Sequence, residues 1–393
     1  MMRKIVLALM VLLPILSVSA QDPLGSLLAT IEKNNISLKS LKEEREAARL
    51  AASVNLYPDN PEVEYNYLTG SPSVIGNRHD FSIRQSFDFP TAYIYKSKLS
   101  ASGKILSDIT YVKSRQELLL EARKLCVDLI YQDKLLRIAS LREEDANRMV
   151  VAYRKMLDEG KGNRLDLNRA MIALAQIRSE VLMMKSLRDG LQSRLNVMNG
   201  GESLDVNIAE FIQIPLPASF EEWYSNYSGQ ISELALLREL VVSKDLSVKV
   251  QRSLTLPKFS AGYMSEKVPG EQFQGVTLGM SLPLWGNRNT VRTLKAEHAS
   301  IVYKLSEEEL RIKAEMNILF DRVISFRAMA ENLRTTLRDT DNDMLLKRAL
   351  ELGEITLMDY LLEYDRYYDL QKEWLGNIHQ SELTYSDLIK SSL

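Results

Sequence analysis

A short strand-like motif occurs twice in the chain, as Pro61-Glu62-Val63-Glu64-Tyr65-Asn66-Tyr67 and again as Pro257-Lys258-Phe259-Ser260-Ala261-Gly262-Tyr263. Successive side chains of an extended chain point to opposite faces. In the first copy the apolar side chains Val63, Tyr65 and Tyr67 therefore share one face, and the polar ones share the other. Such alternation predicts a β-strand whose two faces meet different surroundings.

A second alternating segment follows each motif. Phe81-Ser82-Ile83-Arg84 in the first half of the chain matches Val276-Thr277-Leu278-Gly279 in the second half. Turn residues separate the members of each pair, including Gly70-Ser71-Pro72-Ser73 and Val268-Pro269-Gly270. We therefore expect two β-hairpins, with strands at about 61–69, 80–89, 257–265 and 274–283.

Long helical segments surround the hairpins. Residues 91–158 contain no proline and a single glycine, and residues 289–352 contain neither. Charged and apolar residues alternate there at intervals of three and four, which is typical of coiled coils. The sequence predicts long helices at about 91–158, 165–198, 289–352 and 357–389, with shorter ones near 22–56 and 220–253 before the hairpins.

The same order of elements occurs twice, with a period of about 195 residues. Gly160 through Asp166 corresponds in this scheme to Gly353 through Asp359. A duplication explains this order, with a first repeat over 21–200, a linker over 201–218 and a second repeat over 219–393. The predicted fold class is mainly α with a small β part, each repeat being helix, β-hairpin, long helix, turn and helix.

The first twenty residues have the three parts of a secretory signal peptide. Arg3 and Lys4 form a basic start, an apolar segment follows, and Val18-Ser19-Ala20 is a small-residue cleavage site. The alternative, a short membrane anchor, fits less well because the apolar segment is short for a span. Residues 1–20 are therefore expected to direct export of the chain.

Composition excludes several classes of function. The net charge is −2 and the charges are balanced, whereas a nucleic-acid binder needs a clustered basic excess. One cysteine and three scattered histidines offer poor material for a metal site. The sequence also lacks a nucleophile elbow and a glycine-rich phosphate loop. We therefore expect no enzyme activity, no cofactor and no nucleic-acid partner.

Four strands in one chain leave two unpaired edges, which invite pairing with another chain. In a membrane an open edge is excluded, because its backbone groups would lack hydrogen-bond partners. Several copies that each give four strands to one closed barrel resolve this, and aromatic residues beside the strands fit an interfacial girdle. The alternative is a soluble periplasmic coiled-coil interaction protein with a small sheet and no pore.

Local motifs at equivalent places in the two halves carry a family resemblance: Ile83-Arg84-Gln85-Ser86-Phe87-Asp88-Phe89, Met280-Ser281-Leu282-Pro283-Leu284-Trp285-Gly286-Asn287-Arg288-Asn289, Glu159 through Leu167, and Leu352 through Leu361. In this order, and over essentially the whole mature chain, they resemble the TolC-type outer-membrane efflux channels. The Pro-Leu and Asn-Arg-Asn pattern in the second motif is similar to the CzcC-like cation-efflux branch of that family.

The resemblance implies a homotrimer in the outer membrane of a Gram-negative bacterium, with a twelve-stranded barrel in contact with outer-membrane lipid. A periplasmic α-helical barrel would continue from it. The family acts as a passive exit channel in tripartite systems, with a periplasmic adaptor (membrane fusion) protein and an inner-membrane pump, here expected to be of the RND type. Cargo stays open between metal cations and, alternatively, drugs or secreted proteins.

The resemblance also implies site residues at the two helix turns. The adaptor-contacting candidates are Gly160, Lys161, Gly162, Asn163, Gly353, Glu354, Ile355 and Thr356. The candidates for a periplasmic gate are Asp359, Glu363 and Asp166, whereas Ile355 and Leu350 stand where the family's gating Arg and Tyr would be. In a symmetric trimer one inward Asp359 becomes a ring of three carboxylates, which would favour cations. The alternatives are a solvated charge on the helix surface and an Asp in the N-terminal turn that interacts with the helix dipole.

Overall fold

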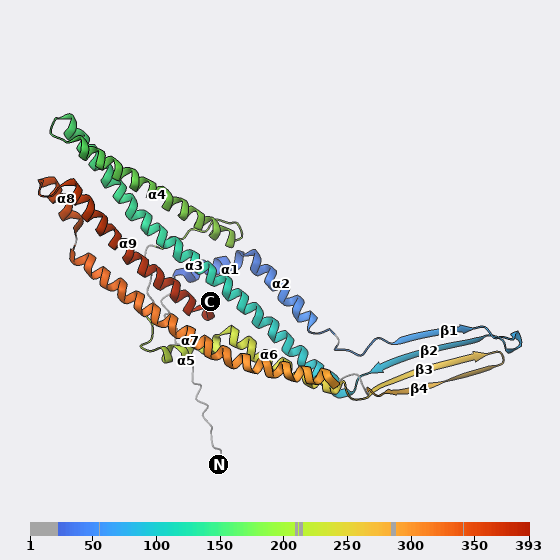
Figure 1. Cartoon of the computed structure of the whole chain (residues 1–393). Coiled ribbons are helices and arrows are strands. Elements are labelled where there is room, and N and C mark those ends of the chain that lie inside the picture. Colours follow the sequence, from blue (N-terminus) through green and yellow to red (C-terminus); the bar gives the residue numbers. More distant parts are fainter. Residues whose placement is uncertain (1–22, 55, 209–210, 212–214, 284–287, 341) are drawn as a thin grey trace, which may run out of the picture. The chain divides into compact units, whose positions relative to one another are not determined.

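The computed structural model describes residues 23–54, 56–208, 211, 215–283, 288–340 and 342–393. The predicted signal peptide, parts of the predicted linker and residues 284–287 of the resemblance motif lie outside these ranges. The fold class is confirmed, because the described residues form mainly helices and one small sheet (Figure 1). In chain order the helices and strands are α1 Pro23–Asn34, α2 Ile36–Ala51, β1 Glu62–Leu68, β2 Arg78–Phe87, α3 Pro90–Asp158, α4 Arg164–Met198, α5 Phe220–Tyr227, α6 Ser232–Ser253, β3 Lys258–Val268, β4 Glu271–Ser281, α7 Arg288–Thr340, α8 Asn342–Leu352 and α9 Leu357–Leu388.

The chain packs into two compact units that cut across the order of the sequence. The first unit comprises Met1–Asn34 and Leu125–Ile214, and the second comprises Asn35–Lys124 and Pro215–Leu393. The boundary falls inside α3, so the units differ from the two predicted repeats. Repeats describe the order of elements along the chain and units describe packing, and the repeat boundaries stay a prediction.

In the first unit, the C-terminal part of α3 packs antiparallel to α4. The ion pairs Arg142–Glu180 at 3.3 Å, Glu143–Arg178 at 3.2 Å and Asp133–Arg188 at 2.9 Å join earlier residues of α3 to later residues of α4. Buried side chains recur on α4 at intervals of three and four, as a helix with one packed face requires. From Leu167 to Met184 they are Leu167, Ala170, Leu174, Ile177, Val181 and Met184, and Leu195 is buried farther along α4.

In the second unit, α7 is the central helix and packs on both α6 and α9. Lys244 of α6 lies 2.6 Å from Glu297 of α7, and the two helices also share the pair Arg238–Glu309 at 2.9 Å. An aromatic cluster attaches α5 to α7, with Trp223 of α5 buried against Phe320 of α7 at a ring-centroid distance of 6.3 Å.

A buried polar layer lies farther along the same unit. The guanidinium groups of Arg123 and Arg327 lie 5.9 and 5.6 Å from the ring centroid of Tyr385, and Arg123 Nε donates to Ser386 Oγ at 3.0 Å. Burial raises the pKa of the Tyr385 phenol to about 12, so the ring stays neutral at physiological pH. Contacts among Arg123, Arg327 and Tyr385 thus connect α3, α7 and α9, at a place where most protein cores contain aliphatic side chains.

The second long helical segment, predicted as one helix over 289–352, is described as α7 up to Thr340 and α8 from Asn342, and residue 341 lies outside the described residues. Within α7, Thr340 Oγ1 donates to the carbonyl of Thr336 at 2.7 Å. The bounds of this predicted helix stay a prediction.

All four strands form one antiparallel sheet in the order β1-β2-β3-β4, which belongs entirely to the second unit (Figure 1). The second hairpin is longer than the predicted 257–265 and 274–283, because β3 extends to Val268 and β4 starts at Glu271. Its turn consists of Pro269 and Gly270, and Gly270 has a φ of 89°, a conformation that glycine adopts at no steric cost. The strands β1 and β4 are the two edges of the sheet.

Gly262 and Gly275 give a matched test of the strand packing. A Cβ at Gly262 would lie 2.4 Å from the carbonyl oxygen of Ile83, whereas a Cβ at Gly275 has open space around it. We expect Gly262→Ala to lower the free energy of unfolding by about 1–3 kcal/mol through overpacking. Gly275→Ala should leave it unchanged or raise it by about 0.5 kcal/mol through lower backbone entropy. Urea denaturation measures both, and equal midpoints would contradict this close approach.

Candidate functional sites

The two faces of the sheet carry different side chains. Strand pairing aligns Val63, Ile83, Tyr263 and Val276 in one row across all four strands. The remaining apolar side chains of this face, by the same alternation, are Tyr65, Tyr67, Phe81, Phe87, Phe259, Ala261, Leu278 and Met280. They are exposed, with Val276 at 78% and Leu278 at 83%, so no described segment covers this face. The predicted pattern of apolar and polar faces is thereby confirmed.

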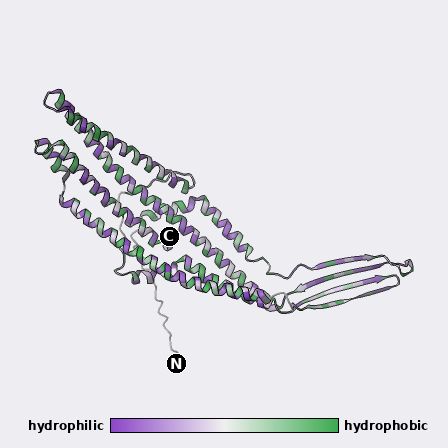
Figure 2. Ribbon diagram, viewed as in Figure 1, coloured by the Kyte–Doolittle hydropathy of each residue, from purple (hydrophilic) through white to green (hydrophobic). Residues whose placement is uncertain are grey.

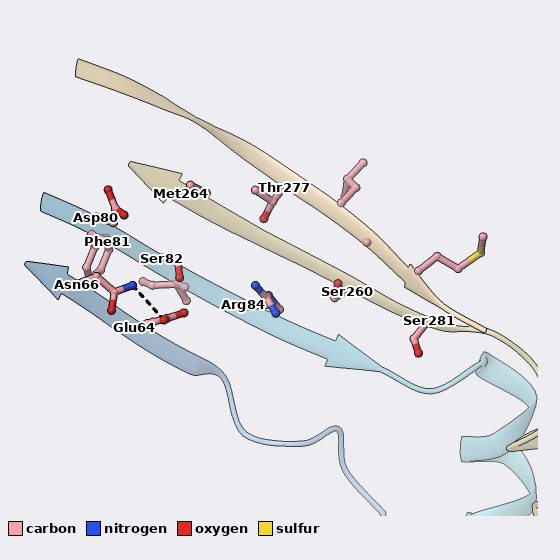
Figure 3. Close-up of a pocket in the computed structure, with 14 residues that line it drawn as sticks. Glu64, Asn66, Asp80, Phe81, Ser82, Arg84, Ser260, Met264, Thr277 and Ser281 are labelled. Carbon is pink, nitrogen blue, oxygen red and sulfur yellow. Dashed lines mark hydrogen bonds between the residues drawn. The ribbon is translucent and has the colours of Figure 1, made fainter. Parts of the chain in front are cut away.

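The opposite face is polar and borders a hollow of about 520 Å³ (Figure 3). Its side chains include Glu64 and Asn66 of β1, Arg84 of β2 and Thr277 of β4. Asn66 Nδ2 donates to Glu64 Oε1 at 3.0 Å, as the dashed line in Figure 3 shows. Water can solvate such a face, whereas the middle of the apolar face exposes mainly aliphatic and aromatic side chains.

Asp88 joins the sheet to the first long helix. Its carboxylate accepts from Lys96 Nζ of α3 at 2.8 Å, and it lies 3.1 Å from Lys258 Nζ of β3. Its backbone N–H donates to the Tyr93 hydroxyl at 2.9 Å. The side chains of Asp88 and Lys96 are 11% and 21% exposed, so this ion pair is largely shielded from water, whereas Lys258 is 48% exposed. The sequence prediction missed this junction, because Lys258 lies in the other half of the chain.

The first helix turn, between α3 and α4, is built from two capping motifs. Gly160 has a φ of 69°, the Gly160 N–H donates to the Leu157 carbonyl, and the Lys161 N–H donates to the Met156 carbonyl at 2.9 Å. This pattern is a Schellman motif, which ends a helix at glycine. Asn163 then caps α4 by accepting from the Leu165 N–H at 2.9 Å.

The second turn, between α8 and α9, repeats this construction. Gly353 has a φ of 73°, and the Glu354 N–H donates to the Ala349 carbonyl at 2.9 Å. Thr356 caps α9 by accepting from the Asp359 N–H at 3.2 Å. The equivalent glycines and caps are what a duplication predicts for this part of the chain. The two turns belong to different compact units.

Asp359 completes a capping box with Thr356. Its Oδ2 accepts from the Thr356 backbone N–H at 3.2 Å and from the Thr356 hydroxyl at 2.6 Å. The hydrogen bond from the Thr356 side chain lowers the pKa of the Asp359 carboxyl below its ordinary value. Asp359 is also exposed and lies in the first turn of α9, where the helix dipole favours a negative charge. The spacing of Thr356 and Asp359 was the available sequence signal for this box.

The other gate candidates are paired with basic neighbours on their own helices. Glu363 Oε1 accepts from Arg366 at 2.7 Å, and Asp166 Oδ1 accepts from Arg169 at 3.2 Å. Among the turn residues, Lys161 lies 3.1 Å from Glu159 and is 74% exposed. Of the candidates, the structure brings Thr356 and Asp359 into direct contact.

Neither a membrane-spanning helix nor a metal-binding cluster occurs in the described part of the chain. No described helix contains an apolar segment long enough to cross a bilayer. Figure 2 shows hydrophilic residues along each of the long helices. No group of three His, Cys, Asp or Glu side chains among the described residues could hold a metal ion.

The Thr356→Ala change tests the capping box. Without the hydroxyl, the pKa of Asp359 should rise towards its ordinary value. Because the folded-state pKa is lowered, the box stabilises the turn above the ordinary Asp pKa and is lost as the pH falls through the folded value. Carbon-13 NMR titration of aspartate-labelled protein, assigned with Asp359→Asn, measures this pKa. Asn163→Ala, in the other turn, is the control and should leave the Asp359 titration unchanged; the same pKa in Thr356→Ala would contradict the box.

No protein-family profile and no curated protein matches the chain. Solved structures with the same fold do exist. The CmeC outer membrane channel of Campylobacter jejuni has a TM-score of 0.76 and 15% identity over 94% of this chain and 85% of that chain. CusC, whose structures describe transmembrane channel formation, has a TM-score of 0.78 and 14% identity over 94% of this chain and 91% of its own.

The VceC outer membrane protein of Vibrio cholerae has a TM-score of 0.76 and 12% identity, over 94% of this chain and 95% of that chain. These likenesses cover 94% of this chain and between 85% and 95% of the three neighbours. Sequence identities of 12–15% support a shared fold and no more detailed similarity. The chain therefore has the fold of these outer-membrane channels, mainly α-helical with a small antiparallel sheet.

Proposed function

We propose that the chain is the outer-membrane exit channel of a tripartite efflux system and that it extends into the periplasm. The two-faced sheet carries this proposal. One face exposes aliphatic and aromatic side chains such as Val276 and Leu278, while the other presents Glu64, Arg84 and Thr277 to a hollow. A wall of a water-filled membrane barrel needs this combination, with lipid on one side and water on the other.

The two edge strands support an oligomer. In a bilayer, the unpaired backbone groups of β1 and β4 would have no partners, so β4 of one copy must pair with β1 of the next. Two copies would make a barrel of about eight strands, whose interior is filled by side chains. Three copies make about twelve strands and leave room for a channel. We therefore propose a homotrimer.

The helices would form the periplasmic tunnel below the barrel. Helix α3 has 69 residues and is about 100 Å long. The two helix turns, Gly160–Asn163 and Gly353–Thr356, would meet a periplasmic adaptor protein, and an RND-type inner-membrane pump would supply the energy. The chain itself would act as a passive duct without catalysis.

Metal cations are the proposed cargo, and drugs or secreted proteins are the alternative. The supporting observation is Asp359, whose carboxyl is exposed and whose pKa is lowered by Thr356. In a trimer, three such carboxylates around the tunnel would attract cations. The inner-membrane pump would mainly determine which cargo is transported. The ring of Asp359 carboxylates would act as a filter at the periplasmic end.

A soluble periplasmic coiled-coil interaction protein is the second candidate, from a different class. Its sheet would have to bury the apolar face, because large exposed apolar patches are rare on soluble monomers. Val63, Tyr263, Val276 and Leu278 remain 40% exposed or more. The channel is therefore the better supported of the two functions.

Lysine substitutions at adjacent positions test which face meets lipid. Val276→Lys places a charge on the apolar face, which costs about 2–4 kcal/mol near the bilayer midplane. We expect it to abolish the heat-modifiable oligomer in outer-membrane fractions. Thr277→Lys is the matched control on the hollow face and should still assemble. Recovery of the wild-type chain in the soluble periplasm, or equal assembly of both variants, would refute the barrel.

Asp359→Asn tests the proposed ring. Removing three carboxylates from the tunnel should lower the cation-over-anion permeability ratio and weaken block by divalent cations. Reversal potentials under a KCl gradient in planar bilayers measure the ratio. Asp365→Asn, on another side of α9, is the control and should behave as wild type. A permeability ratio that does not change in Asp359→Asn would remove Asp359 from the constriction.

A further inference from the structure

At the end of the sheet beside the two hairpin turns, the apolar face carries a row of polar side chains. Strand pairing aligns Tyr67 with His79, His79 with Lys267, and Lys267 with Gln272. Because side chains alternate along each strand, these four lie on the same face as Val63 and Val276. The row therefore marks the point where this face changes from apolar to polar.

Charge is distributed unequally between the two faces. Over the full lengths of the four strands, Lys267 and His79 are the basic side chains that alternation places on the apolar face, and no acidic side chain falls there. All acidic side chains of the strands fall on the hollow face: Glu62, Glu64, Asp80, Glu266 and Glu271. An anion that approaches the apolar face thus meets cationic and hydrogen-bonding groups without a nearby carboxylate on the same face.

Two side chains of this row, Tyr67 and His79, are held in place by their neighbours. The Tyr65 hydroxyl lies 2.7 Å from His79 Nδ1, and the Tyr67 ring lies against the imidazole at a centroid distance of 4.9 Å. Asn77 Nδ2 donates to the Tyr67 hydroxyl at 2.6 Å. His79 Nε2 has no hydrogen-bond partner among the described residues, and Lys267 is exposed and makes no ion pair with them. Both groups are therefore available to a ligand.

The depth of the row fits the surface of a bilayer. His79 lies eight residues along β2 from Phe87, the last residue of that strand. Eight residues span about 27 Å along a strand, or about 21 Å along the bilayer normal at a tilt of about 40°. The apolar band of a membrane barrel is about 25 Å tall. With Phe87 near one boundary, the backbone at His79 and Lys267 lies about 4 Å from the other boundary, and the long lysine side chain can extend to the headgroups.

We propose that Lys267 and His79 bind the phosphate of an anionic lipid headgroup in the outer leaflet, with one site on each protomer. This inference rests on the proposed function, since it requires the sheet to lie in a membrane. The Lys267 ammonium supplies the charge, His79 supplies a ring N–H, and Tyr65 and Tyr67 hold the imidazole in position. The lipid anchors the end of the barrel that carries the hairpin turns.

Native mass spectrometry of the purified oligomer with added phosphatidylglycerol or phosphatidylcholine tests the site. Wild type should retain phosphatidylglycerol in preference to phosphatidylcholine. Lys267→Gln should weaken phosphatidylglycerol binding about fivefold, the value of one lysine at an anionic surface. Lys267→Arg should preserve the preference. Lys304→Gln, an exposed lysine on α7, is the matched control and should bind as wild type.

The outcomes separate this proposal from the proposed function. An oligomer that inserts and conducts but binds both lipids equally overturns the lipid site alone, as does equal binding by wild type and Lys267→Gln. If inorganic phosphate displaces phosphatidylglycerol at equal concentration, the row is a site for soluble anions and the lipid assignment is wrong. Failure of the wild-type chain to form a membrane oligomer would instead refute the channel.

Discussion

Backbone hydrogen bonding at the edges of a four-stranded sheet is the constraint on which the rest of the structure depends. Strands β1 and β4 each use one side of their backbone, and the other side needs partners. One hairpin alone is marginally stable, and two hairpins paired through β2 and β3 still leave both edges open. In the proposed channel, further copies would close the sheet, with lipid against its apolar face and water against its polar face.

The faces of the sheet were predictable from the sequence, while the ends of its strands were not. Apolar and polar side chains alternate around Val63 and Val276 with a period of two. This period does not depend on which strand lies alongside. Lys267 and Gln272, by contrast, are polar on the face where the central residues are apolar, so periodicity places them in a loop. The structure extends the second hairpin through them, because the Pro269-Gly270 turn brings the two strands together at that point.

The sequence predicted the helix turns but not the junction at Asp88, and the sequence separation of the interacting residues explains this difference. Gly160 and Gly353 end helices through local hydrogen bonds, so the sequence alone located both turns. Asp88 depends on Lys258, far along the chain, and neither residue has a local signature. Long-range ion pairs of this kind become visible when the fold brings the two halves of the chain into one sheet.

In the proposed trimer, two influences would act on the pKa of Asp359 in opposite directions. Three carboxylates gathered around a tunnel would repel one another, which raises their pKa and favours protonation. The hydrogen bonds from Thr356 lower the pKa and engage Oδ2 within the same chain. In the proposed trimer the capping box would therefore favour the ionised form of each Asp359 through contacts within its own protomer. Because Asp359 lies in the first turn of α9, its position would follow that helix.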